Sequence, residues 1–123
     1  MFWRYDDLKT VEMLPGVSRR NLAVGEKMMV CEIRLKKGAE VPWHSHPHEQ
    51  VGHVASGRLQ FWIGDEERTL GHGQIVLAPA GQPHGVFNDG PGRLVLLVYM
   101  APNPTPGAMD ERRAQSVDSR HEG

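Results

Sequence analysis

The sequence predicts an all-β protein, a double-sheet jelly roll, on three observations. Short runs that alternate apolar and polar side chains recur along the chain, with turn residues roughly every eight to twelve positions. No segment shows the 3.6-residue apolar period of an amphipathic helix. The length of 123 residues and the 39% hydrophobic content suit one domain with one core. Many short strands of this kind fold as a sandwich or barrel.

The predicted strands follow one another from the N-terminus. Residues 1–24 are predicted to be an arm that pairs as a strand, with a turn at Pro15-Gly16. Further strands are expected where apolar residues alternate or run together, at 17–23, 27–36, 58–63, 66–70, 75–77 and 94–99. Beyond Pro102, residues 103–123 are rich in Pro, Gly and charge, so we expect a flexible C-terminal tail.

Two pairs of these strands are predicted to be hairpins, because only short turn segments separate them. In the first, Lys27–Lys36 alternates apolar and charged residues, so one of its faces should meet water. In the second, Gly64-Asp65 turns Arg58–Ile63 into Glu66–Leu70. Cys31 lies on the apolar face of the first hairpin and is expected to be a small buried hydrophobe. As the single cysteine, it excludes an internal disulfide.

Composition excludes two classes of partner. The formal net charge is −1, and Lys and Arg are scattered, which gives no footprint for nucleic acid or an anionic membrane. The longest apolar run, Leu94–Ala101, is far short of the roughly 20 residues of a membrane-spanning helix. The N-terminus has no signal-peptide pattern. We therefore expect a cytoplasmic protein whose ligand is a small molecule.

A histidine-rich run follows the first predicted hairpin. His44 and His46 are two residues apart in an extended segment, so their side chains point to the same side and can share one ligand. If the strand continued, His48 and Gln50 would join that face. Pro47, however, lacks an N–H and tends to end or bend a strand, so the register beyond it stays open.

A second run brings His84, after the turn-rich segment Pro-Ala-Gly-Gln-Pro. Together the two runs resemble the two motifs of the cupin family. The first motif is matched by Gly38, His44, His46, Gln50 and Gly57, and the second by Gly73, Pro79, Gly81, His84 and Asn88. Fifteen residues, Arg58–His72, separate them. The one departure is Gln50, where the family pattern has Glu. The resemblance covers roughly residues 25 to 100, and it implies a double-stranded β-helix barrel over residues 25–102 that holds one metal.

The resemblance also implies a ligand set. It places His44, His46, Gln50 and His84 around one divalent transition metal, which could be Zn, Ni, Mn, Cu or Fe. The alternative set replaces His44 with His48. A glutamine oxygen leaves the full +2 charge on the ion, which favours polarising a substrate oxygen. A glutamine in place of a carboxylate also disfavours a metal-dependent dioxygenase, because the common iron site of such enzymes contains a carboxylate.

Within the cupins, the run HSHPHEQVGHV resembles small proteins of pectin and alginate breakdown, which open unsaturated uronates to linear keto-sugars. The resemblance implies a sugar-acid isomerase or lyase that acts on a small acidic or oxygen-rich molecule. The family's acid and arginine fall at Leu97 and Asn103, and its aromatic residue at Tyr99. Tyr99 is therefore the predicted catalytic, proton-handling residue, with Gln60 as a second candidate near the metal. The alternative function is a non-catalytic metal-binding or small-ligand-sensing module.

The remaining aromatic residues predict self-association. A barrel of this size should not cover all of its aromatic surface alone, and exposed apolar patches mark interfaces. We therefore expect a homodimer, built on Trp3, Tyr5, Trp43 and Trp62. Trp43 and Trp62 should face away from the metal, and His53 should lie on the face opposite the ligands.

Overall fold

The computed structural model describes residues 1–102, and the predicted flexible tail at 103–123 lies outside them. The described residues form two antiparallel sheets, which confirms the all-β prediction. The larger sheet has the order β1 (Thr10–Leu14), β2 (Val17–Val24), β3 (Met29–Leu35), β10 (Leu94–Ala101), β5 (Glu49–Ser56) and β8 (Ile75–Ala78). The smaller sheet has the order β4 (Glu40–His44), β9 (His84–Phe87), β6 (Arg58–Ile63) and β7 (Glu66–Gly71).

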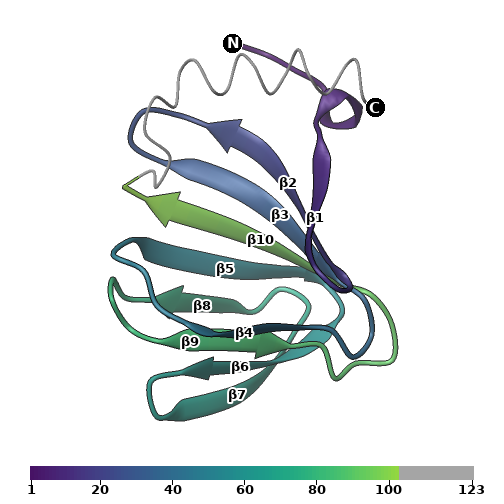
Figure 1. The fold of residues 1–123 in the computed structure, drawn as a ribbon, viewed down its shortest axis with the longest axis vertical. Helices are drawn as coiled ribbons and strands as arrows, with labels where there is room; N and C mark the ends of the chain where they lie inside the picture. Colours follow the sequence, from purple (N-terminus) through teal and green to yellow (C-terminus); the bar gives the residue numbers. More distant parts are fainter. Residues whose placement is uncertain (103–123) are drawn as a thin grey trace.

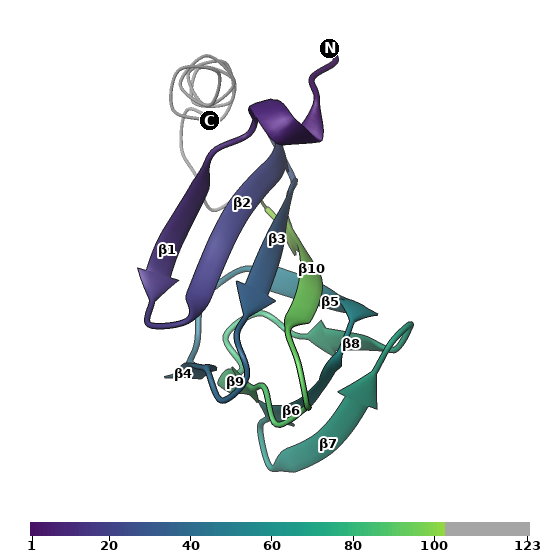
Figure 2. The ribbon, with the colours of Figure 1, turned by 90° about the vertical axis from the view of Figure 1, so that its right-hand side faces the viewer.

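Both predicted hairpins are present. β2 pairs with β3, and β6 pairs with β7. β10, from the end of the described chain, lies between β3 and β5, so its Val98 is opposite Cys31 on one side and Gly52 on the other. Figure 1 shows β2, β3, β10 and β5 side by side, and Figure 2 shows the first three of them next to β1. The last strand therefore joins the N-terminal strands to the strand that follows the histidine-rich run.

The core lies between the two sheets, because alternate residues of each strand point inward. Its buried members are Val17, Val24, Met29, Cys31, Leu35, Val54, Leu59, Phe61, Val86, Leu94, Leu96 and Val98. Cys31 is buried as expected, and this burial raises the pKa of its thiol, although the Arg19 charge opposes the effect. The described residues contain a single short helical turn, Tyr5–Asp7, and no helix long enough to cross a membrane.

Two motif residues fix the loops behind the core. Gly57 has φ +93°, and a Cβ at this position would lie 2.8 Å from the Arg93 carbonyl oxygen. Only glycine fits both this conformation and this close approach. Asn88 is buried, and its Nδ2 donates to the carbonyls of Leu35 and Gly92, each at 2.9 Å. These residues hold the ends of β3, β5 and β9 in place and take no part in chemistry.

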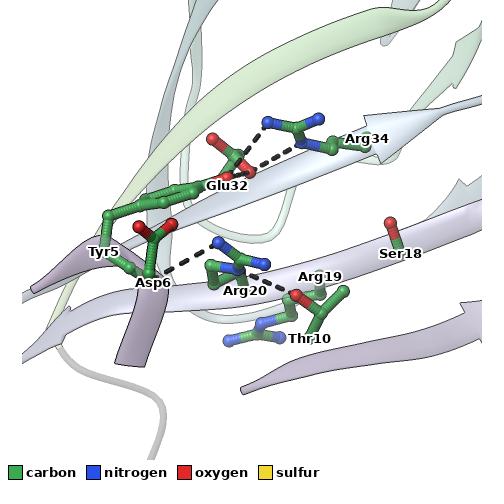
Figure 3. A pocket seen from close by; sticks show the side chains of 8 residues that line it. All are labelled: Tyr5, Asp6, Thr10, Ser18, Arg19, Arg20, Glu32 and Arg34. Carbon is green, nitrogen blue, oxygen red and sulfur yellow. Dashed lines mark hydrogen bonds and ion pairs between the residues drawn. The ribbon is translucent and has the colours of Figure 1, made fainter. Parts of the chain in front are cut away.

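The N-terminal arm pairs with β2 and packs on the outer face of the larger sheet. Trp3 Nε1 donates to the Leu22 carbonyl at 2.6 Å. Tyr5 Oη donates to Glu32 Oε1 at 2.7 Å, and Arg34 Nε donates to the same oxygen at 2.8 Å (Figure 3). The Arg20 guanidinium lies 4.1 Å from the centre of the Tyr5 ring. Trp3 and Tyr5 therefore contact their own chain, and Tyr5 remains 41% exposed.

We expect this cluster to make stability depend on pH. Burial raises the pKa of Glu32, but the hydrogen bonds from Arg34 and Tyr5 outweigh it, so the net pKa is lowered from 4.5. A lowered folded-state pKa stabilises the fold above pH 4.5, and this contribution is lost as the pH falls through the folded value. Tyr5→Phe should lower the free energy of unfolding by about 1 kcal/mol at neutral pH, and by less at acidic pH.

Urea unfolding followed by tryptophan fluorescence, at a series of pH values, measures this difference. Tyr99→Phe is the matched control, because Tyr99 lies outside the arm cluster. A Tyr5→Phe penalty that is the same at pH 7 and pH 3 would show that the tyrosine does not act through the ionised Glu32.

Candidate metal centre

The four predicted ligands come from both sheets. His44 ends β4 and is opposite His84, the first residue of β9, in the strand register. His46 lies in the connection after β4, where its carbonyl accepts a hydrogen bond from the Gly81 N–H at 2.7 Å. Gln50 is the second residue of β5 in the larger sheet. The two sheets therefore meet at this cluster, at one end of the core.

The structure brings the three motif histidines together. The ligand nitrogens of His44, His46 and His84 lie within 4.8 Å of one another. Gln50 Oε1 lies 3.1 Å from His46 Nε2. The His48 ring neighbours His46, with centroids 5.6 Å apart, but His48 is not part of the cluster. Of the two ligand sets predicted from the sequence, the structure assembles the one that contains His44.

Backbone carbonyls fix the orientation of two imidazoles. His44 Nδ1 is 2.8 Å from the Pro42 carbonyl oxygen, and His84 Nδ1 is 3.0 Å from that of Gln82. An Nδ1–H that donates to a carbonyl leaves Nε2 as the unprotonated nitrogen, the arrangement common among metal-binding histidines. The buried Nε2 of His84 has no hydrogen-bond partner among the described residues. Such a nitrogen is costly unless a ligand completes it.

His84 is held in its neutral form. Burial lowers the pKa of His84 from 6.5, the hydrogen bond to Gln82 works in the opposite direction, and the nearby imidazoles of His44 and His46 lower it further. The Phe61 ring stacks parallel to the imidazole, with centroids 6.1 Å apart. A neutral imidazole is the form that binds a metal ion. The aromatic contact and the carbonyl together hold the ring in one orientation.

The donor set fits one transition metal. His46 Nε2 and Gln50 Oε1 lie 3.1 Å apart, a hydrogen-bond distance, so the glutamine oxygen lies next to the cluster of three imidazoles. Imidazole nitrogens suit Zn, Cu, Fe and Ni, and an amide oxygen adds no charge. The cluster can therefore hold a divalent ion without neutralising it.

A cavity of about 180 Å³ opens beside the cluster, between the sheets. Its walls are mainly aliphatic and thioether side chains, with Leu96, Val98 and Met100 of β10 among them. Arg19 is the one permanently charged side chain among the described residues that line it. Arg19 has no sequence signal as a cavity residue, because it stands between Ser18 and Arg20 in a polar run typical of a solvent-exposed strand.

The two residues predicted to handle protons lie elsewhere. On β10, Leu96, Val98 and Met100 line the cavity, so Tyr99 alternates to the outer face, where it is 37% exposed. Gln60 donates from Nε2 to Thr69 Oγ1 at 2.7 Å and to the Asp89 carboxylate at 2.9 Å. Neither side chain lines the cavity. This placement argues against the predicted proton-handling role of Tyr99.

Comparison with known proteins agrees with the fold. Residues 31–100 match the family model described as "Cupin domain". The chain is 27% identical over 92 residues to the pectin degradation protein KdgF of Dickeya dadantii (strain 3937), covering 74% of this chain and 84% of that protein.

Solved structures extend the likeness to the whole jelly roll. The structure of KdgF from Halomonas sp. has a TM-score of 0.75 and 25% identity, and the match covers 89% of this chain and 97% of that one. An RmlC-like protein of Shewanella frigidimarina NCIMB 400 has a TM-score of 0.78 and 24% identity, with 84% and 91% covered. The second likeness concerns the fold alone.

Proposed function

Because this chain belongs to the cupin family, we propose that it is a metal-dependent enzyme of the isomerase or lyase class that acts on a small acidic molecule. The observation that carries the proposal is the buried Nε2 of His84, which has no hydrogen-bond partner among the described residues, in an imidazole whose ligand nitrogen lies within 4.8 Å of those of His44 and His46. A buried imidazole oriented by a carbonyl and left open at its other nitrogen is suited to metal ligation.

The residues of the chain set the chemistry of the site. A divalent ion held by His44, His46, Gln50 and His84 would supply Lewis acidity that polarises a substrate carbonyl or hydroxyl. Gln50 contributes a neutral oxygen, and so preserves the charge on which this acidity depends. The walls of the cavity are mainly aliphatic, and such low-dielectric walls strengthen the electrostatic interactions beside them.

The likeness to KdgF supports a substrate class. Both comparisons with KdgF proteins span most of this chain. The run that contains Gln50 also resembles the small cupins of pectin and alginate breakdown. We therefore propose an unsaturated uronate as the first substrate to test. Leu97 stands where those proteins have an acid. It lies on the outer face of β10 with Tyr99, and β10 has no acidic side chain that could replace that acid at the cavity. The second difference, Asn103, lies outside the described residues.

A non-catalytic metal- or ligand-binding module is the second candidate. One observation favours it: apart from the cluster itself, the described cavity lining offers Arg19 and Cys31 as its polar side chains. Arginine stays protonated in proteins, and burial raises the pKa of the Cys31 thiol. Neither is suited to act as a general base at neutral pH. Turnover separates the two candidates.

We further propose that the chain forms a homodimer through the outer face of the larger sheet. The strand register places Leu77 of β8, Val51 of β5 and Tyr99 of β10 in one row. Ile75 and Leu77 are 64% and 53% exposed. Contiguous apolar surface on a sheet face is typical of an interface.

We expect about one divalent metal ion per chain after loading with zinc and removal of excess metal. His84→Ala and His44→Ala should lose most of this metal, as measured by elemental analysis. His44 is exposed, so its variant tests the site without a cavity in the core. His48→Ala is the matched control and should keep its metal, as should Gln50→Glu. Full metal content in His44→Ala, or its loss in His48→Ala, would contradict the ligand set.

We expect the metal-loaded protein to consume 4,5-unsaturated galacturonate, followed as loss of absorbance of the ring alkene. Because the ligands carry the chemistry, His44→Ala should lower the rate at least about 100-fold, a loss typical of removing transition-state electrostatics. Tyr99→Phe should keep the wild-type rate, because Tyr99 faces outward. No turnover with any metal would favour the binding module instead.

For the dimer, light scattering after size exclusion should give twice the 13.7 kDa chain mass. Leu77→Lys places a charge in the apolar row and should yield a monomer. Val11→Lys is the control, because Val11 is also exposed but lies on β1, away from the row. A dimer that survives Leu77→Lys and dissociates with Val11→Lys would place the interface on the arm.

A further inference from the structure

Arg19 projects from the inner face of the larger sheet. In the register between β2 and β3, Val17 is opposite Leu35 and Arg19 is opposite Ile33, and all four of these residues line the cavity. Its neighbour Arg20 points to the outer face and contacts Tyr5. Arg19 is also among the residues that line the outer pocket of Figure 3, where its guanidinium points away from the cluster of Tyr5, Glu32 and Arg34. The strand register and the cavity lining place its charge on the inner side of β2.

The contacts of Arg19 orient its guanidinium without neutralising it. Nε donates to Asn21 Oδ1 at 2.7 Å, and Nη2 lies 3.8 Å from Met29 Sδ. Both partners are uncharged, and they engage two of the five N–H donors of an arginine. The side chain is half-buried, and its charge reaches the Cys31 thiol, whose pKa it lowers against the effect of burial. A half-buried cation held by neutral partners is suited to bind an anion.

The strand register relates Met29, which Arg19 contacts, to Gln50 beside the histidine cluster. Met29, which Arg19 contacts, is opposite Met100 of β10, and Met100 is opposite Gln50 of β5. The backbone of β3 is thus two strand spacings, roughly 10 Å, from that of Gln50. Met100 lines the cavity between them. One small molecule can therefore reach both the guanidinium and the histidine cluster.

We propose that Arg19 binds the carboxylate of the substrate, a small organic acid whose far end presents an oxygen to the histidine cluster. This inference rests on the proposed metal-dependent function and names the residue that recognises the acid group of its substrate. The guanidinium matches a carboxylate with two parallel N–H donors, and the aliphatic walls keep water from competing for it. Arg19 lies on β2, whereas the arginine of the uronate-opening cupins aligns with Asn103. In this proposal, carboxylate binding is thus a task of β2.

Calorimetric titration of the zinc-loaded protein with 4-oxopentanoate and with its methyl ester tests the proposal. The two probes differ only in the carboxylate, which Arg19 recognises. The wild type should bind the acid at least about tenfold more tightly than the ester, a modest value for one charged hydrogen-bonded contact. Arg19→Gln should abolish this preference, and Arg19→Lys should keep part of it. Arg20→Gln is the matched control on the opposite face and should bind like the wild type.

Metal content and circular dichroism are measured on every variant, so that loss of the carboxylate contact is separated from loss of the metal or the fold. An Arg19→Gln protein that is folded, loaded with zinc and still prefers the acid would overturn the proposal. So would a wild type that binds the acid no better than the ester. If the wild type binds no metal, the proposed function fails, and the same titration of the metal-free protein still decides whether Arg19 binds the carboxylate.

Discussion

The position of β10 between β3 and β5 is the constraint on which the rest of this structure depends. Its pairing with both neighbours fixes which residues of β10 face the core, the cavity and the outer surface. Leu96 and Val98 face inward and complete the core, and Met100 separates Arg19 from Gln50 along the cavity. Tyr99 faces outward and contributes to the exposed apolar row. Because side chains alternate strictly along a strand, a slip of one residue would exchange the cavity wall for the outer surface.

The histidine cluster contains ring nitrogens that have hydrogen-bond partners and ring nitrogens that have none among the described residues. Buried polar atoms usually find partners, and here the carbonyls of Pro42 and Gln82 satisfy one nitrogen of His44 and of His84. The other nitrogen of His84 is buried and has no hydrogen-bond partner within residues 1–102. A ligand that bound it would remove a desolvation penalty of about 1–3 kcal/mol, so ligation would stabilise the folded state.

Much of this arrangement could be predicted from the sequence, but not the direction of every side chain. Motif spacing predicted that His44, His46, Gln50 and His84 lie together, because each has a fixed place relative to turn-forming residues. The structure brings the three histidines of this set within 4.8 Å of one another. The run LVLLVYM is apolar on both faces, so it contains no alternation from which the outward position of Tyr99 could be read. Arg19 was missed for a related reason. Its polar neighbours suggest solvent, and only pairing with β3 shows that it faces the cavity. Long-range register has no local sequence signal.

This chain resembles the uronate-opening cupins at its metal-site motif but differs from them in the groups available for acid–base chemistry. The ligand positions follow the uronate-opening cupins, yet the acid of those proteins is replaced by Leu97 on an outer face. A cavity that lacks a side-chain base would depend on the proposed ion and on substrate alignment for any rate enhancement. With a metal bound as proposed, positive charge would lie at both ends of the cavity, at the histidine cluster and at Arg19, with mainly aliphatic walls between them. In this proposal the electrostatic field would select a small anion, with Arg19 in place of the arginine that the uronate-opening cupins carry at the position of Asn103.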